Sequence, residues 1–97
     1  MLKMLIVVYN EALDMEVMEI LEGFAMKNYT KAPTVFGRGT HSGTHEGNDI
    51  WPGRNSILYV ACEEKQAKEM LQAVKELKNK VSHEGIKAFI LPVEEST

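Results

Sequence analysis

The stretch Asn55–Lys80, NSILYVACEEKQAKEMLQAVKELKNK, decides the fold, because a strand pattern passes directly into a helix pattern. Residues 55–62 are rich in β-branched and aromatic side chains, which is typical of a strand. From residue 63 the apolar side chains follow helical spacing along one stripe: Ala67, Met70, Leu71, Val74 and Leu77. Acidic residues begin this segment and lysines end it, as the helix dipole favours. We therefore predict a strand over 55–62 and an amphipathic helix over 63–80.

The segments on either side predict four further elements. Ile86–Val93, IKAFILPV, reads as a strand that ends near Pro92. The first half of the chain gives a strand over Met1–Tyr9, a helix over Leu13–Asn28 and a strand over 30–38. Pro33 lacks a backbone donor, which places that last strand at a sheet edge. The order predicts a ferredoxin-like βαββαβ sandwich of the α+β class, with two helices on one face of an antiparallel sheet.

Three of these strands are apolar on both faces, although the chain offers only two helices to cover the sheet. In the first strand, for example, Leu5 and Val7 alternate with Met4, Ile6 and Val8. A large apolar patch exposed to water is rare in monomers. We therefore expect copies of the chain to cover the second face, in a closed symmetric assembly. This argument from the residues alone is satisfied by a dimer or by a trimer.

Composition excludes several classes of function. The 97 residues fit a single domain over 1–97, with 44% apolar and 26% charged residues. A net charge of −3 without a basic segment argues against nucleic-acid binding. The apolar start contains Lys3 and is too short to span a membrane, and the single cysteine, Cys62, fits a reducing compartment. We expect a cytoplasmic protein, with Cys62 a buried structural residue.

Two short stretches resemble the P-II-like signalling proteins. Val35–Arg38, VFGR, is similar to the Phe-Gly-Arg that precedes the family's long loop, and Lys87–Glu94, KAFILPVE, is similar to its last strand. The resemblance implies a homotrimer that binds adenine nucleotides (ATP, ADP or AMP) between subunits and contacts partner proteins through the loop. Carried onto this chain, the nucleotide-binding residues are Gly37, Arg38, Gly39 and Lys87. Arg and Lys both suit phosphate groups, although the plainer reading is a loop ion pair and a solubilising charge.

The sequence departs from this family in three places. The glycine-rich turn before the last strand is reduced here to Ser82–Gly85, SHEG, with one glycine. No basic residue follows Lys87, whereas the family has basic residues after its last strand. The loop carries Trp51 where the nitrogen regulators have a modified tyrosine. These departures weaken the expectation of a nucleotide site.

The long loop over residues 39–54 supports a different candidate chemistry. Its sequence from Gly39 to Gly53 is GTHSGTHEGNDIWPG, in which His41 and His45 repeat within Gly-Thr-His. Imidazoles are common ligands of divalent metal ions, and a trimer would supply six of them. Alternatively these histidines are solvated in a glycine-rich loop. Trp51 is a candidate anchor for a partner protein, or a cap on its own sheet edge.

The function that these observations favour is a small regulatory or signalling protein. It would bind a small ligand between subunits and contact a partner protein through the long loop. The alternative is a trimeric metal-binding or metal-tolerance protein that uses the loop histidines. No nucleophile–base pair or paired carboxylate site stands out, so we do not expect an enzyme.

Overall fold

A computed structural model describes residues 1–37, 54–81 and 84–97. The strands and helices follow the predicted order: β1 (Leu2–Asn10), η1 (Glu11–Leu13), α1 (Asp14–Gly23), β2 (Thr30–Val35), β3 (Asn55–Glu63), α2 (Glu64–Lys80) and β4 (Ile86–Pro92). The four strands form one sheet in the order β2-β3-β1-β4, with every neighbouring pair antiparallel. The predicted ferredoxin-like α+β fold is therefore confirmed.

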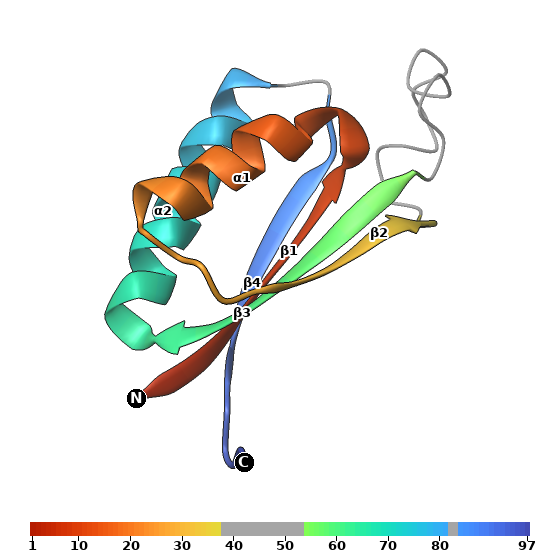
Figure 1. Ribbon diagram of the computed structural model, residues 1–97. Coiled ribbons are helices and arrows are strands. Elements are labelled where there is room, and N and C mark those ends of the chain that lie inside the picture. The colour runs from red at the N-terminus through yellow and green to blue at the C-terminus, as the bar shows by residue number, and fades with distance from the viewer. Residues whose placement is uncertain (38–53, 82–83) are drawn as a thin grey trace.

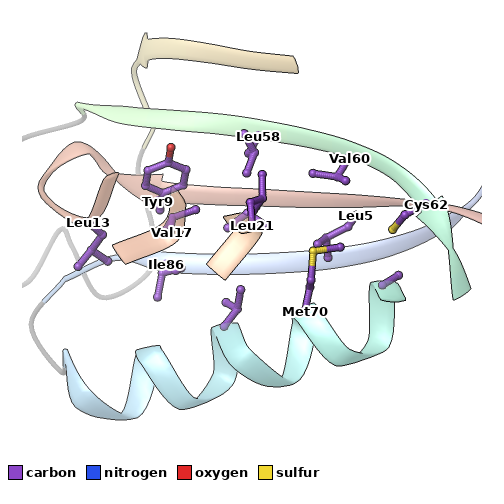
Figure 2. Packing of buried hydrophobic residues seen from close by; sticks show 13 residues of the cluster. Leu5, Tyr9, Leu13, Val17, Leu21, Leu58, Val60, Cys62, Met70 and Ile86 are labelled. Carbon is purple, nitrogen blue, oxygen red and sulfur yellow. The ribbon is translucent and has the colours of Figure 1, made fainter. Parts of the chain in front are cut away.

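Both helices lie on the same face of the sheet (Figure 1). The apolar residues of that face are buried in one core with those of the helices. Figure 2 shows the core from close by, with α2 below the sheet and the labelled α1 side chains, Leu21 and Val17, in the same cluster as those of the strands. The fully buried side chains come from both layers: Leu5, Val7, Tyr9, Val17, Leu58, Val60, Ala67 and Met70. Cys62 is also buried, which confirms its prediction as a core residue. Its burial, and then the neighbouring Glu63 carboxylate, raise the pKa of the Cys62 thiol and make the reactive thiolate less available.

Helix α1 is shorter than predicted: it ends at Gly23 and not at Asn28. Ala25 has a left-handed backbone with φ of 54°, and two hydrogen bonds close the end: the Ala25 amide on Glu22 O and the Met26 amide on Leu21 O. This is the pattern of a Schellman motif, in which glycine usually takes the left-handed position. The apolar spacing continues past Gly23, so periodicity alone placed the helix end too late.

Strand β2 forms one edge of the sheet, as Pro33 predicted, and it ends at Val35 and not at Arg38. It pairs with β3 over Thr30–Ala32, and the register then shifts before Val35. Thr34 lies in this irregularity with φ of 56°. A positive φ is unfavourable for a β-branched residue, because its Cβ crowds the backbone.

Within residues 1–37, 54–81 and 84–97, both helices cover one face of the sheet and leave its second face open. Residues opposite one another in the ladders share a face of the sheet, and successive pairs alternate between the two faces. The registers therefore define an open face made of Met4, Ile6, Val8, Ile57, Tyr59, Ala61, Phe89 and Leu91. Tyr59 is 37% exposed, Phe89 48% and Leu91 46%. The expectation that two helices cover only one of two apolar faces is therefore confirmed.

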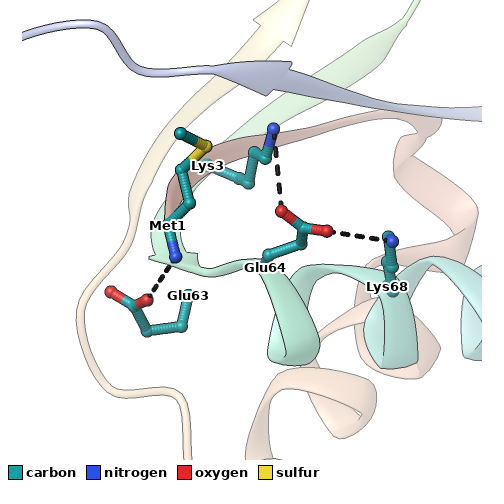
Figure 3. Close-up of polar contacts among 5 residues, drawn as sticks. All are labelled: Met1, Lys3, Glu63, Glu64 and Lys68. Carbon is teal, nitrogen blue, oxygen red and sulfur yellow. Dashed lines mark hydrogen bonds and ion pairs between the residues drawn. The ribbon is translucent and has the colours of Figure 1, made fainter.

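At the end of the sheet where β1 begins, charged groups form a surface cluster (Figure 3). The N-terminal ammonium of Met1 lies 3.0 Å from Glu63 Oε1, and Glu64 lies 3.0 Å from Lys68 and 3.9 Å from Lys3. Lys68 and then Lys3 lower the pKa of the Glu64 carboxyl. Exposed pairs of this kind contribute little to stability. They lie at the opposite end of β1 from Asn10.

A partly buried network joins β1, α1 and β2 through a single carboxylate. The Tyr9 hydroxyl donates to Asp14 Oδ1 (2.6 Å), and Lys31 Nζ donates to the same oxygen (2.9 Å). The hydrogen bond from Tyr9 and then that from Lys31 lower the pKa of Asp14, and the positive charge of Lys31 lowers it further. A carboxyl whose pKa is lower in the folded state stabilises the fold above its unfolded pKa, and this contribution disappears as the pH falls through the folded value.

We predict that Asp14→Asn lowers the free energy of unfolding by about 1 kcal/mol at neutral pH, since the substitution weakens two hydrogen bonds to a charged group that is partly exposed. The difference from wild type should shrink below about pH 4, where the carboxyl of the unfolded wild-type chain is protonated. Urea denaturation at neutral and acidic pH, at one protein concentration, measures both values. The exposed Glu22→Gln is the control, and an equal loss for the control would contradict the assignment.

Candidate functional site

Gly37 lies two residues after the end of β2 and close to Asn55 at the start of β3. A Cβ at this position would lie 3.2 Å from the Asn55 side-chain nitrogen, which is tighter than ordinary contact. Glycine therefore lets the backbone approach Asn55. The preceding residue, Phe36, is 80% exposed, a high value for a large aromatic side chain. On the β2 side, the described part of the predicted nucleotide site is thus Gly37, close to Asn55 and next to the exposed ring of Phe36.

Lys87 lies on β4, at the opposite edge of the sheet from β2. It pairs with Val8 and is exposed, so its side chain belongs to the open face, near the end of the sheet where Asn10 pairs with Asn55. Three strand spacings of about 4.8 Å separate β2 from β4, or roughly 14 Å. One chain therefore places Gly37 and Lys87 at the same end of the sheet, and does not bring them together.

The turn from β1 into η1 is hydrogen-bonded to three other segments, at Thr34, Arg54 and Gly85. The Asn10 amide donates to Gly85 O (2.9 Å), and the Glu11 amide donates to Arg54 O (3.2 Å). The Asn10 side chain accepts from the Ala12 amide (2.8 Å), and Glu11 Oε2 accepts from the Thr34 hydroxyl (2.8 Å). Sequence reasoning did not single out Asn10 or Glu11. The only local signal was an asparagine at a strand end, a type that commonly caps a helix.

Several predicted site residues lie outside the described part of the chain. Arg38 and Gly39 of the nucleotide site, His41 and His45 of the alternative metal site, and Trp51 all fall within residues 38–53. Among residues 1–37, 54–81 and 84–97, no three His, Cys, Asp or Glu side chains are placed to hold a metal ion. The metal site and the partner-binding role of Trp51 stay predictions.

Two shallow hollows open on the helical side of the molecule, and neither Gly37 nor Lys87 lines them. One is lined mainly by acidic and methionine side chains: Glu11, Ala12, Asp14, Met15, Met18, Glu19 and Glu22. The other lies between α1 and α2, and its charged lining is three glutamates and Lys80. Carboxylates repel phosphate groups, so neither hollow suits a nucleotide.

Among the helices that the structure describes, none has the length and apolar character of a membrane span.

Comparison with solved structures finds the same fold in regulatory proteins of the P-II type. A candidate PII-like signaling protein from Thermus thermophilus is 25% identical, with a TM-score of 0.64 over 92% of this chain and 82% of the other. CPII of Thiomonas intermedia K12, a nitrogen regulatory PII-like protein, was solved bound to ADP, AMP and bicarbonate. It is 17% identical, with a TM-score of 0.71 over 93% and 89% of the two chains. A protein of unknown function from Pediococcus pentosaceus is 18% identical, with a TM-score of 0.66 over 99% and 95%.

Comparison with curated protein sequences gave no match. Comparison with protein families, however, matches residues 2–97 to the family described as nitrogen regulatory protein P-II. That match covers nearly the whole chain, including both stretches that carry the resemblance, and it agrees with the strand order and with the similar structures. This chain belongs to the nitrogen regulatory protein P-II family.

Proposed function

We propose that this protein is a homotrimeric regulator that binds an adenine nucleotide between subunits and contacts a partner protein through residues 39–54. Gly37, Arg38 and Gly39 of one subunit and Lys87 of a neighbour would contact the phosphates. Trp51 would contact the partner. Family membership supports the regulatory role. The adenine nucleotides bound by CPII of Thiomonas intermedia support the class of ligand.

The observation that carries this proposal is the placement of Gly37 and Lys87 at opposite edges of one sheet. A phosphate group cannot contact both residues across roughly 14 Å within a single chain. Their position at the same end of the sheet lets an edge of one subunit meet the opposite edge of another. A closed ring of copies repeats that meeting at every boundary.

The open face supports the assembly that such a site requires. Its middle row places Tyr59, Ile6 and Phe89 side by side across three strands, and all three are partly or largely exposed in the single chain. An apolar surface of this extent favours association, because its burial removes it from water. Lys87 lies at the margin of this face, where a neighbouring subunit would approach it.

We predict that ATP binds the purified assembly and that Lys87→Ala weakens the binding about 10-fold or more. A hydrogen bond to a charged group contributes about 1.5–3 kcal/mol, and each 1.4 kcal/mol is a factor of ten. Isothermal calorimetry with ATP, ADP and AMP in turn measures both effects. The matched control is Lys65→Ala, which removes the same charge from an exposed position on α2. The absence of heat with all three nucleotides, or an equal loss for Lys65→Ala, would contradict the proposed site.

A further inference from the structure

Glu11 holds the chain on both sides of residues 38–53. Its carboxylate accepts a hydrogen bond from the Thr34 hydroxyl at 2.8 Å, and its backbone amide donates to Arg54 O at 3.2 Å. Thr34 lies three residues before Gly37, and Arg54 immediately precedes Asn55, which packs against Gly37. Glu11 is therefore hydrogen-bonded both to the segment that leads into Gly37, at Thr34, and to the segment that leads into Asn55, at Arg54.

The conformation of Thr34 is unfavourable by itself. Its φ of 56° is in the left-handed region, and a β-branched residue held there costs on the order of 1–3 kcal/mol. Such a conformation persists only where the surroundings hold it. Ladder pairing holds Thr34 weakly, because the register shifts between Ala32 and Val35. The described contact that opposes the strain is the hydrogen bond from the Thr34 hydroxyl to Glu11.

The backbone at Thr34 sets the direction in which the chain leaves β2. If φ at Thr34 returned to the usual negative range, the following residues would turn away from their present course. Gly37 would then lose its close approach to the Asn55 side chain, where a Cβ would already make a tight contact of 3.2 Å. The hydrogen bond between Glu11 and Thr34, which we call the Glu11–Thr34 clasp, is therefore placed to act on Gly37 without touching it.

We propose that Glu11 is a positioning residue of the ligand site, acting through Thr34 to place Gly37 at the subunit edge. This inference rests on the proposed function for its ligand, whereas the conformational effect stands on the structure alone. Electrostatics would assign Glu11 the opposite role. A carboxylate near a phosphate site repels the ligand, so its removal without the clasp would tighten binding.

The first test follows the conformation of the full-length protein by NMR. Backbone couplings and Cα and Cβ shifts report the sign of φ at Thr34, and the amide resonance reports the surroundings of Gly37. Glu11→Ala and Thr34→Val each remove the clasp, and both should shift the Gly37 amide in the same direction; in Glu11→Ala the Thr34 signals should shift as well. Glu11→Gln keeps an acceptor oxygen and should shift Thr34 and Gly37 least. A Gly37 amide that is unchanged in both Glu11→Ala and Thr34→Val, or unchanged Thr34 signals in Glu11→Ala, would overturn the proposal.

A second variant separates positioning from general support of the fold. Glycine adopts a positive φ readily, so Thr34→Gly should keep Gly37 in place without the hydrogen bond. Adding Glu11→Ala to Thr34→Gly should then change the Gly37 signal little, because no strained residue remains to be held. An effect of Glu11→Ala that is as large in this background as in wild type would overturn the proposal.

The third test measures ATP affinity by calorimetry on the same variants. Loss of one hydrogen bond predicts that Glu11→Ala and Thr34→Val weaken binding about 3- to 10-fold. Thr34→Gly should stay near wild type. Glu22→Ala, which removes a carboxylate from the exposed surface of α1, is the control and should not weaken binding. Tighter binding by Glu11→Ala would overturn the positioning role. If wild type binds no ATP, the proposed function fails, and the NMR results still decide whether the clasp controls Gly37.

Discussion

Ile6→Glu should convert the proposed trimer into monomers, with a mass by light scattering of one third of the wild-type value. Ile6 occupies the centre of the open face, between Tyr59 on β3 and Phe89 on β4. A carboxylate buried there without a partner costs about 3–5 kcal/mol in each subunit. The side chain is only partly buried in the single chain, so the monomer should keep its fold by circular dichroism.

The control for Ile6→Glu is Gln72→Glu, which adds the same charge to an exposed position on α2. It should leave the trimer intact. A wild-type protein that scatters light as a monomer in dilute solution would refute the assembly, and with it a nucleotide site built from two subunits. An Ile6→Glu variant that stays trimeric would show that the open face is not the interface.

Leu58→Ala should lower the free energy of unfolding by about 2–5 kcal/mol, the usual cost of a cavity in a packed core. Leu58 is completely buried in the middle of β3, on the face that the two helices cover (Figure 2). The total stability of a small domain is about 5–15 kcal/mol, so this loss is a large part of it. Urea denaturation at a fixed protein concentration measures the change.

Leu91→Ala removes the same atoms from the open face and is the matched comparison. Leu91 is 46% exposed in the single chain, so its truncation should act on association and not on the core. In the monomeric Ile6→Glu background, the loss from Leu58→Ala should persist and the loss from Leu91→Ala should largely disappear. Equal losses for both variants in that background would show that the two faces do not differ as described.

The candidate site was predictable from the sequence only in part. The stretches VFGR and KAFILPVE identified the family and singled out Gly37 and Lys87. Spacing along the chain could not show that these residues occupy opposite edges of the sheet, since strand order depends on pairing between distant segments. Nor could it relate Glu11 to Thr34, which lie 23 residues apart and meet only because η1 turns back beside β2.

The sequence by itself determined the element order, the fold class and the excess of apolar strand faces over helices, because alternation and helical spacing are local properties of the chain. It also indicated Pro33 as an edge residue, because proline lacks a donor wherever it stands. Only the tertiary structure decided which strand face stays open, where α1 ends, and which carboxylate holds Thr34 at a positive φ. The open face and the hold on Thr34 arise from contacts between segments far apart in the chain, of which local patterns carry no record. The end of α1 is set by local hydrogen bonds around Ala25, a residue that does not by itself signal a left-handed backbone.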